Sequence, residues 1–257
     1  MATQAPALPL FYKNLVPLQS GVHARFHTRT VDGAPFFANT HAVPLTVDEF
    51  LLAQRNYPIV FSSGDQPVPL GLFGLNEGVN VYVDEAGKLK QEIYVPAYVR
   101  RYPWMLARLS PDAAELSLCF DPEADRVGEF EEGDALFEGE KPTEVTNSVL
   151  KFCEEFEISA QRTNAFMTEL KELDLLMEGE VAIQIPEQQQ PFVYRGFQMV
   201  NEQKFRELRG DTMRKLNQNG ILPLIVAHLF SLSLIQTVFS RQLLSGQVPG
   251  AQMPVLN

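Results

Sequence analysis

The most regular alternation of hydrophobic and polar positions lies in the second half of the chain. Apolar residues recur there every three or four positions from Val145 to Leu173, which is the spacing of one face of an α-helix. Thr143 precedes the repeat and offers an N-cap. The pattern predicts a long amphipathic helix over residues 144–176, or two helices broken near Ser159.

A second helical segment, residues 222–244, is apolar on most sides. His228, Ser231 and Gln236 interrupt it with polar groups. The segment therefore predicts a buried core helix rather than a membrane span. We expect an exposed helix over residues 204–217 before it.

Short apolar runs bounded by turn residues predict strands. These runs fall at residues 58–62, 68–75, 80–84, 114–120, 181–185 and 192–200. Because they follow one another closely, with short turns between several of them, antiparallel pairing is favoured.

Two further helices are expected in the first half of the chain. Thr46 and Glu49 have the spacing of a capping box, which predicts the start of a short helix. Pro96 begins a helix over residues 97–109, which Pro103 strains because proline has no N–H to donate.

Together these elements predict an α+β fold. An element with one hydrophobic face must bury that face against another element. We therefore expect a mainly antiparallel sheet of five or six strands packed by the long amphipathic helix and the C-terminal apolar helix. Residues 1–257 are interpreted as a single domain. Residues 121–143, which are rich in acids, are expected to form a solvated loop, and residues 246–257 a loose tail.

Charge and composition narrow the function. The 257-residue chain carries a net charge of −11, which opposes binding to nucleic acid and docking on an anionic membrane surface. The N-terminus has neither the basic residues nor the long apolar run of a secretory signal, so we expect a cytoplasmic protein. Cys119 and Cys153 belong to no Cys-x-x-Cys pair and are expected to be buried thiols.

One cluster combines basic and aromatic side chains. Arg100, Arg101, Tyr102 and Trp104 lie within five positions; arginine can bind a carboxylate or phosphate through two N–H groups, and an aromatic ring can stack on a ligand. His228, in the apolar helix, is the other candidate, because burial would lower its pKa. Both features also fit purely structural roles, as local ion pairs and core packing.

Signals for metals and cofactors are weak. His23 and His27 are four residues apart, but their context favours a strand or loop and no acid completes a ligand set. Gly71 and Gly74 lack the third glycine of a dinucleotide-binding loop. We therefore expect no metal and no cofactor.

Longer segments resemble a known family. The segments that carry the resemblance are 61–84, 94–104, 193–202 and 220–232, in that order along nearly the whole chain. The sequence resembles the bacterial SapC family, which is distinct from the membrane-spanning peptide-transporter permeases that share the name. The resemblance implies an association with the bacterial surface layer (S-layer) and implies no established enzyme activity. Arg195, inside the third segment, joins the candidate binding residues.

Three hypotheses follow. In the first, the protein is a noncatalytic binding or accessory protein of cell-surface biogenesis, and it holds a protein or peptide partner near Arg100, Arg101, Trp104 and His228. In the second, it is an enzyme that uses His228 as acid or base and Arg101 to clamp an anion. In the third, it is a structural subunit of the surface layer and associates with itself into an ordered oligomer.

Overall fold

The structure is a computed structural model, and it describes residues 8–110, 115–185 and 190–249. Its helices are α1 (Ser20–His23), α2 (Phe50–Ala53), α3 (Ala97–Arg101), α4 (Glu144–Glu172), α5 (Glu202–Arg206), α6 (Gly210–Gln218), α7 (Ile221–Ser231) and α8 (Ile235–Leu244), with 3-10 turns η1 (Pro35–Phe37), η2 (Val47–Glu49) and η3 (Leu232–Leu234). The mixture of helices and antiparallel strands confirms the predicted α+β class.

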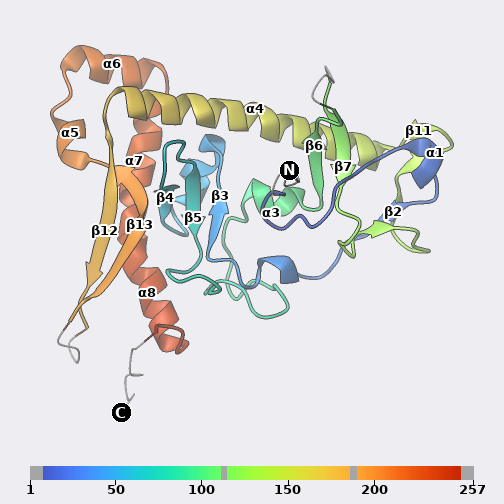
Figure 1. The fold of residues 1–257 in the computed structure, drawn as a ribbon, viewed down its shortest axis with the longest axis horizontal. Coiled ribbons are helices and arrows are strands. Elements are labelled where there is room, and N and C mark those ends of the chain that lie inside the picture. The colour runs from blue at the N-terminus through green and yellow to red at the C-terminus, as the bar shows by residue number, and fades with distance from the viewer. Residues whose placement is uncertain (1–7, 111–114, 186–189, 250–257) are drawn as a thin grey trace, which may run out of the picture.

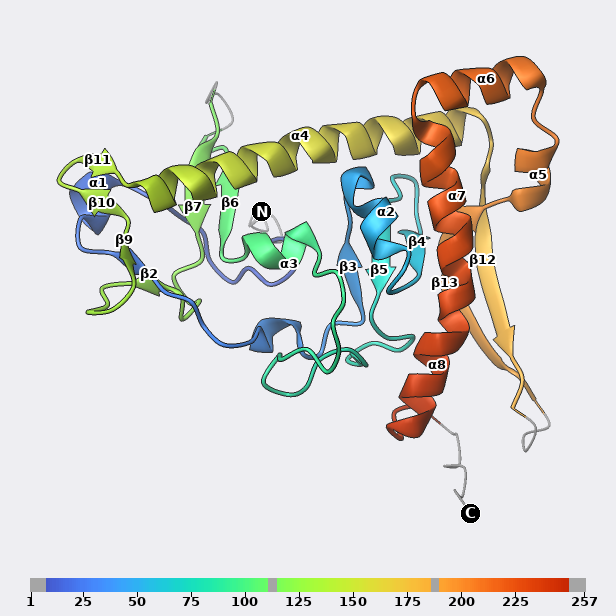
Figure 2. The same cartoon turned by 180° about the vertical axis from the view of Figure 1, so that it is seen from behind.

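The central sheet has five antiparallel strands in the order β12-β13-β4-β5-β3. They span β3 (Ala42–Pro44), β4 (Ile59–Ser62), β5 (Pro69–Leu72), β12 (Leu176–Ile183) and β13 (Phe192–Val200). Helix α7 contacts β4 and β13, and α8 continues along the β12–β13 hairpin (Figure 2). The sheet agrees with the predicted size and pairing.

The smaller strands lie at the other end of the molecule (Figure 1). β1 (Val16–Pro17), β7 (Ser117–Phe120) and β6 (Trp104–Ala107) form one sheet, β8 (Val127–Gly128), β2 (His27–Thr28) and β9 (Asp134–Ala135) form another, and β10 (Phe137–Glu138) pairs with β11 (Lys141–Pro142). Helix α4 crosses the molecule above both ends (Figure 1).

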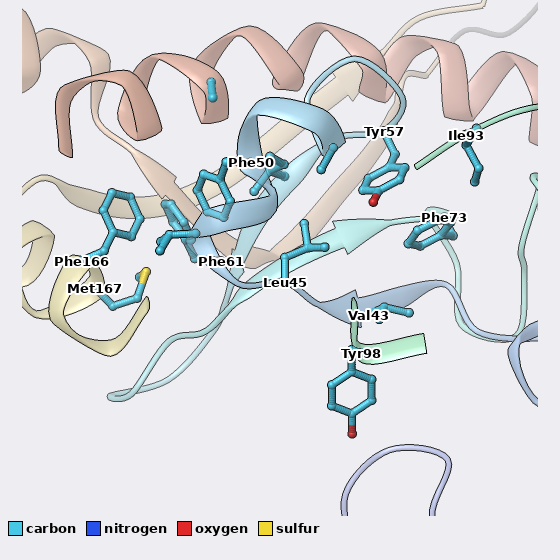
Figure 3. Packing of buried hydrophobic residues seen from close by; sticks show 14 of the residues in the cluster. Val43, Leu45, Phe50, Tyr57, Phe61, Phe73, Ile93, Tyr98, Phe166 and Met167 are labelled. Atoms are coloured by element: carbon cyan, nitrogen blue, oxygen red, sulfur yellow. The ribbon is translucent and has the colours of Figure 1, made fainter. Parts of the chain in front are cut away.

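Of the four hydrophobic clusters among the described residues, the two largest lie at the two ends of the molecule. The main cluster lies under α2, α4 and α7 and includes Phe50, Phe61 and Phe166, which are at most 2% exposed (Figure 3). The second cluster is built around Trp104 and Leu136. Helix α4 contributes to both, through Phe166 in the first and Cys153 in the second.

The long helix forms without a break. It begins after Thr143, whose side chain accepts a hydrogen bond from the backbone N–H of Thr146, and it passes through Ser159. It ends at Glu172, earlier than expected, and Asp174 adopts a left-handed backbone with φ of 53°. Such a conformation ends a helix, and the chain then continues directly into β12.

Three predicted elements were wrong. The helix over residues 97–109 stops at Arg101, because Pro103 cannot continue it, and β6 follows. Residues 80–84 form no ladder; Asn80 instead donates its side-chain N–H to Phe37 O and accepts from Tyr82 N–H. The helix over 204–217 is two helices, α5 and α6.

The acidic segment 121–143 is not a plain solvated loop. It contains β8 to β11, and Val127 and Leu136 are 4% and 0% exposed in the second cluster. Its apolar side chains thus anchor it, and its acids face solvent except Asp121, which is 0% exposed. In the tail, Val248 is also buried, whereas the predicted looseness of residues 250–257 lies outside the described residues.

The C-terminal helical segment packs through buried apolar residues and also through polar side chains. Ser231 Oγ accepts from Ile59 N–H at 2.9 Å, and Gln242 Oε1 accepts from Leu75 N–H at 3.0 Å. The opposite face is open, with Phe230 70% exposed. Ile221–Leu244 is long and apolar enough to span a membrane, with a mean hydropathy of 1.9 and 33% of that window buried, so the predicted core helix is buried on one side only.

Candidate functional site

A cavity of about 620 Å³ lies between α3, β6, β2 and the N-terminal half of α4. We call it the arginine pocket. The residues that line it are Thr28, Arg29, Thr30, Val31, Arg100, Arg101, Tyr102, Pro103, Trp104, Arg126, Glu144, Val145, Ser148, Val149 and Phe152. Four of these side chains are arginines and one is an acid, in a chain whose net charge is −11. The wall is therefore locally basic within an acidic protein.

Arg101 forms the buried part of this wall. Its side chain is 5% exposed, and its guanidinium lies 4.0 Å from the ring centre of Phe156 and 4.9 Å from that of Tyr98. Nη1 contacts Glu157 at 3.4 Å, while Nε has no hydrogen-bond partner. A buried N–H without a partner costs about 1–3 kcal/mol.

Arg100 is held by a relay of hydrogen bonds. Its Nε donates to Val95 O at 3.1 Å, and Nη2 donates to the Tyr94 hydroxyl at 3.1 Å. That hydroxyl donates to Glu49 Oε1, which also accepts from the Ala97 N–H at the start of α3. The relay fixes the direction of the Arg100 side chain although its residue is exposed.

Arg29 and Arg126 complete the basic wall. Arg29 pairs with Asp125 and lies 4.0 Å above the ring centre of Phe130. Arg126 donates from Nη2 to Gly33 O at 2.9 Å, and burial lowers the pKa of its guanidinium. Sequence reasoning missed both residues. Arg126 has no other basic residue near it in the sequence, whereas Arg29 follows Arg25, Phe26 and His27, a signal that could have found it.

The four arginines differ in how their charge is balanced. Arg29 and Arg101 each have a carboxylate within 4 Å, whereas within the described chain Arg100 and Arg126 have none. The N-terminal turn of α4, with Glu144 at its start, also lines the cavity, and the partial charge at a helix N-terminus is positive. The geometry thus suits an anionic group.

The two aromatic candidates have mainly structural contacts. Trp104 is 6% exposed and belongs to the second cluster, and its carbonyl accepts from the Tyr12 hydroxyl at 2.6 Å. Burial, aided by the negative charge of Asp121, raises the pKa of Tyr102 to about 12. Both residues also line the arginine pocket, so core packing and pocket lining coincide here.

His228 does not line the arginine pocket. It is 0% exposed, its ring stacks on Phe61, and both ring nitrogens bind backbone groups: Nδ1 contacts Ile59 O at 2.8 Å and Nε2 accepts from Val200 N–H at 3.1 Å. Burial lowers its pKa to about 4. The expected convergence of His228 with Arg100 and Arg101 is therefore not present.

Arg195 also lies outside the arginine pocket. It is on β13, with its side chain 67% exposed, and it pairs with Glu180 on β12 at 2.6 Å. An exposed pair of this kind contributes little to stability. Among the described residues, no group of three or more His, Cys, Asp or Glu side chains could hold a metal ion.

Comparison with known proteins decides the family. The model of the SapC family matches residues 18–238 of the 257-residue chain. The chain belongs to the SapC family. This SapC match spans every residue that lines the arginine pocket. No curated protein and no solved structure matches the SapC chain.

Proposed function

We propose that this SapC-family protein is a noncatalytic accessory protein of bacterial cell-surface (S-layer) biogenesis, and that its arginine pocket binds an acidic group of a protein partner. One observation carries the binding role. Four arginines from three separate segments line one cavity, and two of them, Arg100 and Arg126, have no acidic partner among the described residues. Arginine binds carboxylates through paired N–H groups.

The alternative of an enzyme that uses His228 and Arg101 in one cavity has less support. The nitrogens of His228 are occupied by Ile59 and Val200, and its surroundings are the main cluster rather than the arginine pocket. The structural-subunit alternative would require ordered self-association, which the oligomeric state in solution tests directly.

We also propose that the protein acts in the cytoplasm. Cys119 and Cys153 are both free and buried, and the pKa of the Cys153 thiol is raised to about 11 by burial. Unpaired thiols are usual in a reducing compartment. Fractionation of the host cell tests this location; recovery only in the extracellular layer would contradict it.

Site-specific photo-cross-linking tests the binding role. Ser148 is exposed at the arginine pocket, and Ser240 is exposed on α8. We expect a photoreactive amino acid at Ser148, but not at Ser240, to capture a component of the surface layer in host cells. The yield should fall at least about tenfold in the Arg100→Gln/Arg126→Gln protein, because each lost charged hydrogen bond is worth about 1.5–3 kcal/mol.

A matched control separates charge at the pocket from charge in general. Arg195→Gln removes an arginine outside the pocket and should leave the yield unchanged. An adduct that forms equally at both serines, or that persists without Arg100 and Arg126, would contradict the proposal.

A further inference from the structure

A second cavity adjoins the arginine pocket. Its volume is about 410 Å³, and it shares Val31, Arg100 and Arg126 with the arginine pocket. We call it the apolar hollow, because eight of its fourteen lining residues have apolar side chains: Val31, Ala34, Phe36, Phe37, Val83, Leu89, Val95 and Val99. The two cavities therefore form one cleft, and the two arginines without an acidic partner stand where the cavities meet.

Two of the charged side chains in the apolar hollow balance each other. Lys88 and Asp32, which also line it, bind each other. The remaining uncompensated charge is at Arg100 and Arg126, and the guanidinium of Arg126 lies 5.8 Å from the ring centre of Phe36. An anion at the junction would thus sit beside hydrocarbon on one side and the larger basic cavity on the other.

This juxtaposition restricts the ligand, and the argument rests on the binding role proposed above. A carboxylate needs paired N–H donors, which arginine provides. The Phe36 side of the junction is lined mainly by apolar side chains. A chain whose last residue is apolar carries its carboxylate and its hydrocarbon side chain on the same carbon, and capture of a terminal carboxylate is a recurring mode of peptide recognition.

We propose that the cleft binds the C-terminal residue of a partner chain. The terminal carboxylate lies between Arg100 and Arg126, an apolar side chain fills the apolar hollow, and the preceding residues run through the arginine pocket. The pocket's 620 Å³ far exceeds what a carboxylate requires, which leaves room for those residues. Its size is in the range of ligand sites.

The chain contains its own probe for this binding. Trp104 is the single tryptophan, and it lines the arginine pocket. Titration of the full chain with the peptide acetyl-Gly-Ser-Gly-Leu, which has no aromatic residue, should change the emission of Trp104. Amidation of the terminal carboxylate, or replacement of the terminal leucine by serine, should weaken binding about tenfold or more.

Two variant pairs test the two halves of the cleft. Arg126→Gln should weaken the leucine peptide at least about tenfold, whereas Arg195→Gln should have no effect. Leu89 lines the apolar hollow and is 43% exposed, as is Leu116 outside the cleft. Leu89→Glu should weaken the same peptide and Leu116→Glu should not, and circular dichroism of each variant verifies folding.

Four outcomes would overturn this inference: equal binding of acid and amide, equal binding of leucine- and serine-ended peptides, loss of binding in Leu116→Glu, or binding of acetyl-leucine as tight as that of the peptide. The last result would identify a small carboxylic acid as the ligand. Arginine-dependent cross-linking at Ser148 without peptide binding would leave the proposed function standing and refute only the terminal carboxylate.

Discussion

The imidazole of His228 is neutral in the folded protein because of its two backbone contacts. Nδ1–H donates to Ile59 O, so Nε2 carries the lone pair that accepts from Val200 N–H. A second proton, on Nε2, would point that N–H at the N–H of Val200, in a site without solvent. The pKa of about 4 agrees with this arrangement, since burial penalises the charged form.

This arrangement makes stability depend on pH. The folded pKa of His228 lies below its usual 6.5, so the unfolded chain binds a proton more readily. The contribution of neutral His228 to the free energy of unfolding is fully present above pH 6.5. It is lost as pH falls toward 4, by up to about 3 kcal/mol for a pKa shift of this size. Urea unfolding at several pH values should show the decline.

The matched variant is His228→Gln, which keeps polarity without titration. It should be less stable than the parent at pH 7, and its stability should decline less between pH 6.5 and 4. His23 is retained in both proteins, so its own lowered pKa contributes equally. An identical decline in the two proteins would show that His228 is not responsible.

Part of the site could be predicted from single residues. Arg100, Arg101, Tyr102 and Trp104 were found because a basic and aromatic run is visible in the sequence, and all of them line the cavity. Arg126 could not be found in this way. It reaches the pocket only because the acidic segment folds back on β2, and a contact between distant segments leaves no local signal.

Among the elements, α4 shows what periodicity can predict. Its apolar repeat located the helix, and Thr143 marked its start correctly. The suspected break at Ser159 does not occur. Ser159 is 5% exposed, and its Oγ has no hydrogen-bond partner, so the helix continues at the cost of an unsatisfied hydroxyl.

Replacement of that hydroxyl gives a prediction. Ser159→Ala should raise the free energy of unfolding by about 1–3 kcal/mol, because it removes a buried unpaired polar group and alanine favours a helix. Ser148→Ala, at an exposed position of the same helix, should gain only about 0.5 kcal/mol from propensity. Chemical denaturation measures both; equal gains would mean that Ser159 finds a partner in solution.

The predicted strand over residues 80–84 failed for a physical reason. Residues 80–84 have the composition of a strand, yet Val81, Tyr82 and Val83 are all at most 8% exposed. They are buried on every side in an irregular segment whose hydrogen bonds come partly from Asn80. Alternation in a sequence shows which side chains are apolar; it does not show whether a neighbouring strand is available.

At the scale of the whole molecule, α4 links the two largest hydrophobic clusters. Phe166 lies in the main cluster and Cys153 in the second, so one rigid helix belongs to both. If the interpretation of residues 1–257 as a single domain holds, disruption of either cluster should also destabilise the other.

Substitutions that create a cavity in one cluster or the other test this interpretation. Phe166→Ala and Leu136→Ala remove side chains that are 2% and 0% exposed, and each should cost about 2–5 kcal/mol. Trp104 fluorescence reports on the second cluster and far-UV circular dichroism on the whole chain. Phe166→Ala should shift both transitions to the same lower denaturant concentration; a Trp104 transition that stays in place would reveal two independent units.

The relay from Glu49 through Tyr94 to Arg100 has a consequence for recognition. An arginine on an open surface samples many rotamers and must give them up when it meets an acid. Here the carboxylate of Glu49, which is 3% exposed, fixes the Arg100 guanidinium through Tyr94 before any ligand binds. The Arg100 side chain therefore loses less conformational entropy when it binds an acid, so a larger part of the interaction energy contributes to affinity.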